Sequence, residues 1–566
     1  MRRALRAFLL FLLLIVGIVF LIWPTHESNA QETNSTILIV GTVIDRQNQP
    51  VREADVKLFG PASQEPLTEA MTQSNGRFAL PVSGNFPDSL TIKIDRPHFK
   101  EISLQLKNSQ IQLLRAGETV VLEPVTMVRN ISPAFWISTA VFLLVLVLIA
   151  TGRLHNTLAA LFGTALIFSI SYLGSAIRED LFIFQFSDAI GYIDWNVIFL
   201  IMGMMIVIAT IERTGLFQWL AFFAYRISGG RAWLLVAILM VTTGIASAFL
   251  DNVTTMLLMT PITIQIAMAL GINPLALLMP EVFASNVIGI STLVGTPTNI
   301  LIGSFANITF NDFLVNQTPG VLLAMAGLVL YCEWLYRSEL TSAREPSPEL
   351  IARLEERAQI NQPGNLKKSG WVGAGMLLLF VFGEHFHLQP SVTALIGATA
   401  LLLWIRPDIE EMIESVDWTT LVFFMTLFIV VGSIQEVGLI SIIADLIGRV
   451  VGENLTLAVM AIIWFSAILS TVVANIPFTA AMLPVIGFLS STIPGADNKI
   501  LFYALSVGSA MGGNGSLIGA SANMVTAGIS ERAGHPITYV YFLKKGLPAL
   551  FITVALATIW IFIRFR

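Results

Sequence analysis

Two pairs of polar motifs recur within long apolar stretches of this 566-residue chain. The first pair is SAFLDNVTTMLLMTP (247–261) and STVVANIPFTAAMLP (470–484), in each of which an Asn stands nine positions before a Pro. The second pair is GTPTN (295–299) and GASAN (519–523). Displacements of 223 and 224 positions relate the copies, so one internal duplication explains both pairs. Oxygen atoms of such residues can coordinate Na⁺, and the free N–H groups of an interrupted helix can bind an anion.

The candidate ion-binding residues are the amide and hydroxyl side chains of these motifs. In the first half they are Asn252, Thr254, Thr255, Thr296, Thr298 and Asn299. In the second half they are Asn475, Thr479, Ser521 and Asn523. The four Asn residues of this set are the candidate Na⁺ ligands. The alternative interpretation is that the Asn and Thr side chains only cap broken helices and hold the breaks closed.

Asp251 is a separate candidate because its counterpart in the second copy is Ala474. A carboxylate at membrane depth costs roughly 2.5 kcal/mol or more and is normally part of a proton or ion path. Asp251 could therefore exchange a proton for a cation, although it could instead cap the helix that follows it. Glu281 is a weaker candidate, because we expect it near the membrane interface.

The composition defines the class of protein. Hydrophobic residues make up 55% of the chain and charged residues only 12%, which indicates a polytopic helical membrane protein. Broken helices survive in lipid only where they line a polar cavity, and matching breaks in two halves are typical of secondary transporters. The net charge of -5 gives no reason to expect nucleic acid, and the single Cys332 excludes an intramolecular disulfide. No nucleotide-binding or hydrolase motif is present, so we do not expect an enzyme.

Hydropathy divides the membrane part into two transporter repeats, 133–336 and 370–566, joined by a cytoplasmic linker at 337–369. Each repeat should contain a re-entrant hairpin, with arms near 233–250 and 255–270 in the first, and an interrupted helix, near 275–305 and 500–529. If the N-terminal segment is exported, the basic loops fall in the cytoplasm, as membrane proteins prefer. The two repeats are then inverted copies, and the C-terminus is extracytoplasmic.

The N-terminal part differs in character. Residues 1–30 combine Arg2, Arg3 and Arg6 with an apolar run, which indicates a signal peptide or a signal anchor. Residues 36–125 alternate apolar and polar positions between turn signals, which predicts an extracytoplasmic antiparallel β-sandwich. The segments GTVIDRQNQPVREADVKL and TQSNGRFAL resemble the carboxypeptidase regulatory-like domain. That resemblance implies a fold and no chemistry, and it leaves the partner of the sandwich unknown.

The motifs LDNVTTMLLMTP, GTPTN, ANIPFTAAMLP and GGNGSLIGASANMVTAGISERAGHPITYVYF resemble a known transporter family. It is the arsenite/sodium-proton antiporter/P-protein (ArsB/NhaD) group of the ion transporter superfamily, which shares a citrate-transporter-like domain, and the chain looks closest to the P-protein branch. The resemblance implies an elevator-type secondary transporter, generally dimeric, with hairpins and interrupted helices around the ion. P-protein relatives tend to have an acid where this chain has Thr296.

We therefore predict a secondary active ion transporter of the inner or plasma membrane. The first hypothesis is Na⁺/H⁺ antiport, with Na⁺ and H⁺ as coupling ions and no other cofactor. The second is Na⁺-coupled transport of a small anion, either a di- or tricarboxylate or arsenite. A third, less favoured, is a membrane sensor. The expected partners are membrane lipid, the small ion and a second copy of the chain in a homodimer.

Overall fold

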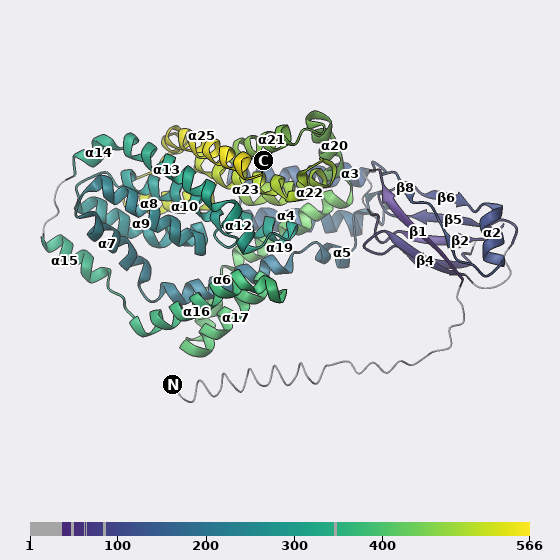
Figure 1. The fold of residues 1–566 in the computed structure, drawn as a ribbon, viewed down its shortest axis with the longest axis horizontal. Coiled ribbons are helices and arrows are strands. Elements are labelled where there is room, and N and C mark those ends of the chain that lie inside the picture. The colour runs from purple at the N-terminus through teal and green to yellow at the C-terminus, as the bar shows by residue number, and fades with distance from the viewer. Residues whose placement is uncertain are drawn as a thin grey trace. The chain divides into compact units, whose positions relative to one another are not determined.

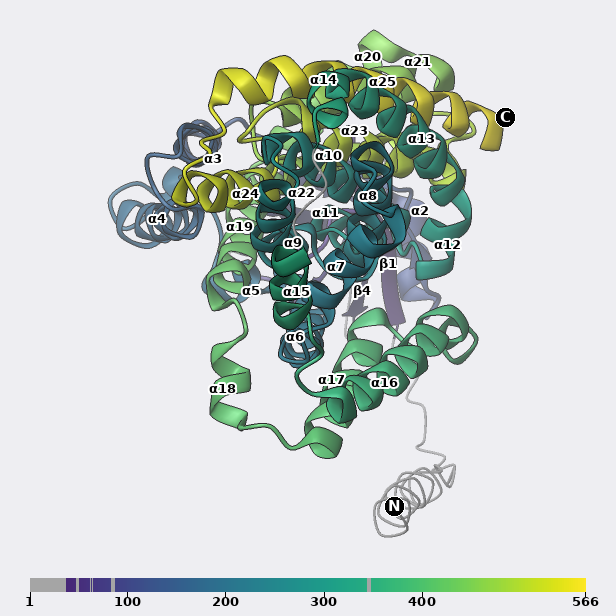
Figure 2. The same ribbon diagram turned by 90° about the vertical axis from the view of Figure 1, so that its left-hand side faces the viewer.

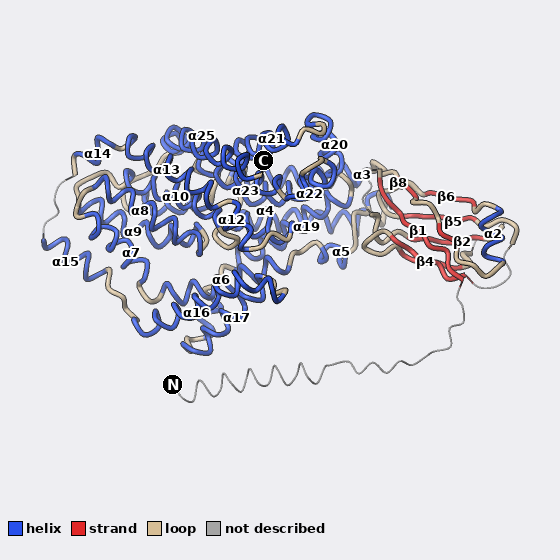
Figure 3. The backbone as a smooth tube through the Cα atoms, viewed as in Figure 1, coloured by secondary structure: helices blue, strands red, loops and turns tan. Residues whose placement is uncertain are grey.

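The computed structural model describes residues 37–46, 50–61, 63, 65–82, 87–343 and 348–565. The predicted signal segment, 1–30, lies outside these residues. The chain divides into two compact units, one reaching Arg129 and the other beginning at Asn130. The first is built mainly of strands and the second of helices (Figure 3).

The N-terminal unit contains two four-stranded sheets. One has the order β4-β1-β7, with β8 also paired to β1, and the other has the order β3-β2-β5-β6. The elements are β1 (Ile37–Asp45), β2 (Asp55–Phe59), β3 (Thr68–Met71), β4 (Arg77–Val82), β5 (Thr91–Asp95), β6 (Ile102–Gln105), α2 (Asn108–Arg115), β7 (Val120–Val121) and β8 (Val125–Met127).

Alternation of apolar and polar residues builds this unit. In β4, Phe78, Leu80 and Val82 are buried while the residues between them are exposed, so one face of the strand forms the core. The predicted sandwich is mostly antiparallel, but β7 and β8 pair with β1 in parallel. The helix α2 lies between β6 of the other sheet and β7, which then pairs with β1.

The helical unit contains two successive sets of helices (Figure 1). The first set is α3 (Pro133–Thr151), α4 (Asn156–Ser169), η1 (Ile170–Gly174), η2 (Glu179–Leu181), α5 (Phe186–Gly191), α6 (Trp195–Glu212), α7 (Leu216–Ser228), α8 (Ala232–Phe249), α9 (Asn252–Ala269), α10 (Leu275–Ile288), η3 (Gly289–Ser291), α11 (Pro297–Ala306), α12 (Phe310–Asn316), α13 (Thr318–Leu335), α14 (Arg337–Thr341) and α15 (Pro348–Arg357). The second set is α16 (Pro363–Phe382), η4 (Gly383–Phe386), α17 (Pro390–Ile405), α18 (Ile409–Glu414), α19 (Trp418–Glu436), α20 (Leu439–Val451), α21 (Leu455–Ser470), α22 (Asn475–Thr492), η5 (Ala496–Asn498), α23 (Ile500–Gly512), η6 (Gly513–Gly515), α24 (Ser521–Arg532) and α25 (Tyr539–Arg564).

Ten helices in the described part of the chain are long and apolar enough to cross a membrane. Their outer faces expose large apolar side chains, such as Leu330 and Trp334 on α13, which are 68% and 72% exposed. Such faces suit contact with lipid rather than with water. The chain is therefore a multi-pass helical membrane protein, as its composition predicts.

The duplication extends well beyond the motifs. The helices α6, α7, α8 and α9 begin 223 positions before α19, α20, α21 and α22, respectively. Both interrupted helices break at a short 3₁₀ turn, η3 in the first set and η6 in the second. The two breaks are 224 positions apart, as their motifs are. The sequence repeat is therefore also a repeat of secondary structure.

The two sets of helices pack into one another in matched pairs. The helix α6 packs on α17 as α19 packs on α4, and α9 packs on α24 as α22 packs on α11. Figure 2 shows α9 beside α24. This reciprocal pattern is what two repeats related by a two-fold axis produce. It brings the hairpin of each set against the interrupted helix of the other.

The hydrophilic segment 337–369 is more ordered than a plain linker. It contains α14, α15 and the first two turns of α16, which begins at Pro363 rather than near 370. The amphipathic helix α15 buries Leu354 and packs on α7 and α9. The backbone N–H of Asn361 also donates to the carbonyl of Thr214, at 2.9 Å, beyond the end of α6. Periodic apolar positions within a polar segment thus anchor it to the helical unit.

Candidate functional site

Asp251 occupies the tip of the first hairpin, between α8 and α9. Its side chain caps α9: Oδ1 accepts from the N–H groups of Val253 and Thr254 at 2.8 and 2.9 Å. Oδ2 accepts from the Thr254 hydroxyl at 2.6 Å. The residue is partly exposed. The capping role considered from sequence is therefore present, and it places a carboxylate at the positive end of α9.

The tip of the second hairpin has the same backbone plan without the carboxylate. Ala474 precedes α22 in an extended conformation, and no side chain caps this helix. Asn475, the first residue of α22, has 6% of its surface exposed, and Asn252 has the same exposure at the equivalent position of α9. The Thr479 hydroxyl donates to the carbonyl of Asn475 at 2.7 Å, one turn back. The hairpin tips thus differ in charge but share a buried amide side chain.

Similar hydrogen bonds stabilise the two helix breaks. Asn299 Nδ2 donates to the carbonyls of Ile290 and Thr292, at 2.9 and 2.8 Å. Asn523 Nδ2 donates to those of Gly513 and Ser516, at 2.7 and 2.9 Å. These carbonyls have no helical partner, because the chain is unwound there, so the amide groups satisfy them. The predicted closing role of these two Asn residues is therefore present in both halves.

Each break is also bonded to the hairpin of its own half. The hydroxyl of Thr292 donates to the carbonyl of Ala248, and that of Ser516 donates to the carbonyl of Thr471 at the equivalent place. The backbones approach so closely that a Cβ on Gly295 would lie 2.4 Å from the carbonyl oxygen of Gly289. Only glycine fits at such a distance.

The first prediction follows from this close approach. Replacing Gly295 by Ala should lower the unfolding free energy by about 1–3 kcal/mol, because backbone rather than flexible side-chain atoms must move. Thermal unfolding in detergent would measure it. Gly373 on α16 is the control, since a Cβ there meets nothing within 4 Å. Equal melting temperatures for the two Ala variants would contradict the close packing of the break.

Four amide side chains from both halves form one buried cluster, which we call the amide cluster. Asn252 Nδ2 donates to Asn286 Oδ1 at 2.9 Å. Asn286 Nδ2 in turn donates to the side-chain oxygens of Asn514 and Asn523, at 2.9 and 3.0 Å. All four residues are at most 6% exposed. The cluster joins α9 and α10 of the first half to η6 and α24 of the second.

Asn299 belongs to a different group of polar residues. Its Oδ1 accepts from the Ser506 hydroxyl of α23 at 2.6 Å, and the same hydroxyl lies 3.2 Å from Gln317 Oε1. The hydroxyls of Thr296 and Thr298 are 3.2 Å apart at the start of α11. Asn299 thus also links the two halves, on the side where α11 packs on α22.

The structure brings together part of the predicted ion site. Asn252 and Asn523 meet through Asn286, and Asp251 and Thr254 lie one or two residues from Asn252 at the same tip. Within the described residues, no side-chain hydrogen bond connects Asn299 or Asn475 to the amide cluster. The predicted side chains Thr255, Thr298 and Thr479 are fully buried, whereas Ser521 is partly exposed.

Sequence reasoning missed two members of the amide cluster. Asn286 has Ala510 as its counterpart, and Asn514 has Ile290, so the comparison of repeats discards both. Asn514 lies within the glycine-rich tract GGNG. The available signal was a polar residue without an equivalent in the other repeat, within a mostly apolar segment.

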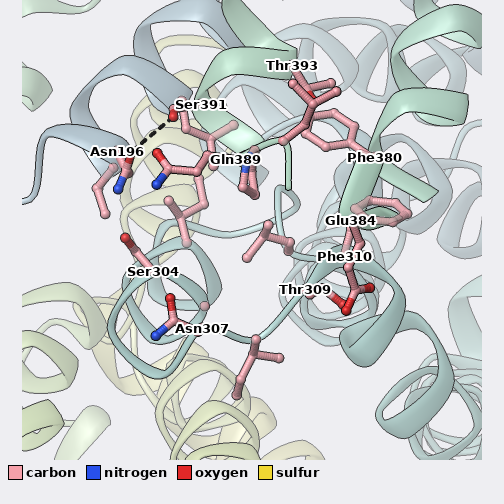
Figure 4. A pocket seen from close by; sticks show the side chains of 18 of the residues that line it. Asn196, Ser304, Asn307, Thr309, Phe310, Phe380, Glu384, Gln389, Ser391 and Thr393 are labelled. Atoms are coloured by element: carbon pink, nitrogen blue, oxygen red, sulfur yellow. Dashed lines mark hydrogen bonds between the residues drawn. The ribbon is translucent and has the colours of Figure 1, made fainter. Parts of the chain in front are cut away.

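A cavity of about 320 Å³ lies beside the first interrupted helix, among α6, α11, α12, α16 and α17 (Figure 4). Its wall includes Leu293 and Ile300, on the two sides of the GTPTN segment. Asn196 and Ser391, joined by a 3.1 Å hydrogen bond, line the opposite side. The cavity therefore reaches the first break from the side of α6 and α17.

Comparison with known proteins adds the following. Residues 146–508 match the family described as citrate transporter. An uncharacterized transporter of Mycobacterium tuberculosis is 36% identical over 430 residues, which cover 76% of this chain and 98% of the relative. The P protein of Homo sapiens is 31% identical over 496 residues, covering 74% of this chain and 58% of that protein. The solved YdaH transporter of Alcanivorax borkumensis has a TM-score of 0.47 and 14% identity, covering 76% of this chain and 98% of that one.

Proposed function

The chain belongs to the citrate transporter family, and from this premise we propose that it exchanges Na⁺ for H⁺ across the cell membrane. The family predicted from the hairpin and break motifs is confirmed, and with it the class of membrane transporter rather than enzyme. The substrate and the coupling are our proposal, which rests on the chemistry of the hairpin tips and the amide cluster.

The observation that carries the proposal is the pairing of a carboxylate with buried amide oxygens at one hairpin tip. Asp251 lies next to Asn252, whose amide is held by Asn286. Amide, hydroxyl and carbonyl oxygens are ligands that Na⁺ takes at broken helices, and a carboxylate adds the charge that attracts a cation. We infer that Na⁺ binds at this tip, with Asp251 taking a proton when Na⁺ leaves.

Anion transport is the second candidate because of the helix N-termini at the second hairpin and at both breaks. The helices α11, α22 and α24 all begin without a side-chain cap. Free N–H groups in their first turns are therefore available to a carboxylate or another anion, although Pro297 at the start of α11 supplies none. At α9, by contrast, Asp251 already occupies the N–H groups. A Na⁺ beside Asp251 and an anion at the uncapped tips would give Na⁺-coupled anion transport.

We further propose inverted repeats and an elevator-type movement. The two hairpins and the two interrupted helices pack on one another, while α6 and α19 pack on α17 and α4. The cavity in Figure 4 lies between α11, which belongs to the group of hairpins and interrupted helices, and α6 and α17, which belong to the other group. A boundary with free volume is where one group could slide against the other. In the proposed orientation the β-unit, this cavity and the C-terminus are extracytoplasmic.

One experiment distinguishes the two candidates. Purified protein on a solid-supported membrane would be exposed to Na⁺, Li⁺, arsenite and dicarboxylates at several pH values. We expect currents or proton release with Na⁺, dependent on pH, and none with the anions alone. Saturable dicarboxylate currents that require Na⁺ would replace our first candidate by the second.

A further inference from the structure

A carboxyl group away from both hairpin tips is completely buried. Glu281 lies in the middle of α10 with 0% of its surface exposed, and every residue of α10 is buried. Its expected position near the membrane interface stays a prediction, but the side chain is enclosed by protein. The reason is that α10 is enclosed on all sides by α8, α9, α13 and elements of the second half.

The surroundings of Glu281 provide a place for one proton. The Thr243 hydroxyl of α8 donates to Oε1 at 3.1 Å. The Thr263 hydroxyl of α9 is a further neighbour of the carboxyl. Yet neither Thr263 Oγ1 nor Glu281 Oε2 has a partner with hydrogen-bond geometry. A proton on Oε2 could be donated to Thr263 Oγ1, so that one proton satisfies both atoms.

No cation compensates this carboxyl in the described part of the chain. The neighbouring elements α8, α9, η3 and η6 contain no charged or titratable side chain. Those on the other helices that pack on α10 are Tyr331, Cys332 and Glu333 of α13, Tyr503 of α23, Glu531 and Arg532 of α24, and Tyr539, Tyr541, Lys544, Lys545 and Arg564 of α25. None of them forms a hydrogen bond or ion pair with Glu281.

The geometry of α10 turns Glu281 away from the basic residues of α25. Phe283 contacts Phe542 of α25, with ring centroids 5.5 Å apart. Side chains two residues apart on a helix point in directions that differ by about 200°. Glu281 therefore faces α8 and α9 instead. An ionised carboxylate is costly in such a place, whereas a protonated one is accommodated.

A line of hydroxyl groups, spaced by one helical turn, extends from Glu281 towards the first break. Ser247 follows Thr243 by one helical turn on α8, and Ser285 follows Glu281 by one turn on α10. The Ser285 hydroxyl donates to Ser247 Oγ at 2.9 Å, and the Ser247 hydroxyl donates to the Ser285 carbonyl at 3.1 Å. The carbonyl of Ser247 in turn adjoins Gly295. Asn286, next to Ser285, enters the amide cluster.

The second half lacks this acid. Leu505 stands where Glu281 stands in the first half, although Ser466, Ser470 and Ser509 repeat the neighbouring hydroxyl positions. The hydroxyl of Ser466 accordingly has no hydrogen-bond partner. The carboxyl is thus an addition to one copy of the shared plan, beside the same hairpin that carries Asp251.

We propose that Glu281 is a second proton-binding residue of the exchange, in addition to Asp251. Oε2 takes up one proton when Na⁺ leaves the first hairpin tip and releases it to the hydroxyl line when Na⁺ returns. With one proton on each carboxyl, two protons move in one direction for each Na⁺ in the other, so one net charge crosses the membrane per cycle. This inference rests on the proposed Na⁺/H⁺ exchange.

The test is the dependence of Na⁺ flux on membrane potential in proteoliposomes, with K⁺ and valinomycin setting the potential. The wild type should exchange Na⁺ for H⁺ at a rate that follows the potential. Glu281→Gln mimics the protonated acid, so its exchange should lose the dependence on potential while Na⁺ still exchanges. Glu281→Asp should restore the dependence. Glu333→Gln on α13 is the control and should keep the wild-type response.

Several outcomes would overturn the inference. An electroneutral wild-type exchanger, or full dependence on potential in Glu281→Gln, would exclude a proton at Glu281. Absence of any pH-driven Na⁺ flux in the wild type would instead refute the proposed function itself. If Glu281→Gln does not fold, Thr243→Val provides the test. The variant lacks the Thr243 hydroxyl, which donates to Glu281 Oε1 and so stabilises the ionised carboxylate. The pH of half-maximal flux should therefore move upward, and an unchanged pH profile would refute the role of Glu281.

Discussion

Replacing Asp251 by Asn should reduce pH-driven Na⁺ flux in proteoliposomes by about 100-fold. A carboxylate about 4 Å from a cation contributes on the order of 4 kcal/mol in a partly buried site. Loss of most of this interaction, about 3 kcal/mol, would weaken the affinity for Na⁺ about 100-fold. Asn still caps a helix well, so the change removes the charge and keeps the hairpin tip. The flux would be measured with ²²Na⁺ at low Na⁺ concentration.

The chain offers a matched control for this variant. Asp417 caps α19 in the same way, accepting from the N–H and the hydroxyl of Thr420 at 3.1 and 2.5 Å. Asp417→Asn should therefore show how much stability the protein loses with a capping charge, while the affinity for Na⁺ stays unchanged. Full pH-driven Na⁺ flux in Asp251→Asn would refute cation exchange at this tip. Under the anion alternative, the variant would lose Na⁺ coupling but keep binding of the anion.

Replacing Asn286 by Ala should weaken the apparent Na⁺ affinity by about 10- to 100-fold, the range for residues that orient the ligands of a metal ion. Asn286 holds the amide groups of Asn252, Asn514 and Asn523 from both halves. Its loss also leaves buried polar atoms unpaired, at a cost of about 1–3 kcal/mol in stability. Na⁺ titration of the flux and thermal unfolding would measure the two effects separately.

The repeat itself shows that the backbone tolerates this substitution. Ala510 occupies the position in α23 that Asn286 occupies in α10. A strong effect of Asn286→Ala would therefore come from the lost amide group rather than from the helix. Asn365→Ala is the control, because Asn365 is partly exposed and its amide donates to the side chain of Gln362, away from the amide cluster. Unchanged Na⁺ affinity in Asn286→Ala would show that the amide cluster is structural only.

The hydropathy and the internal repeat were sufficient to predict most of the helical unit. The predicted hairpin arms near 233–250 and 255–270 lie within three residues of α8 and α9. The predicted breaks at GTPTN and GASAN begin four positions after the ends of the 3₁₀ turns η3 and η6. These features are local: a run of apolar residues fixes a membrane helix, and Gly, Pro and Asn in such a run fix its interruption. The parallel pairing of β7 and β8 with β1 was not predicted, because it joins the two ends of the N-terminal unit.

The sequence by itself thus determined the class of protein, its two repeats, and the residues at the tips and breaks, because each is a matter of composition or of short-range spacing. Only the tertiary structure decided which of these residues meet. Asn252 and Asn523 come together through Asn286, and Glu281 is enclosed far from water, because α9 packs on α24 and α8 on α10. These contacts join positions from about 35 to more than 200 residues apart, and no periodicity along the chain specifies them.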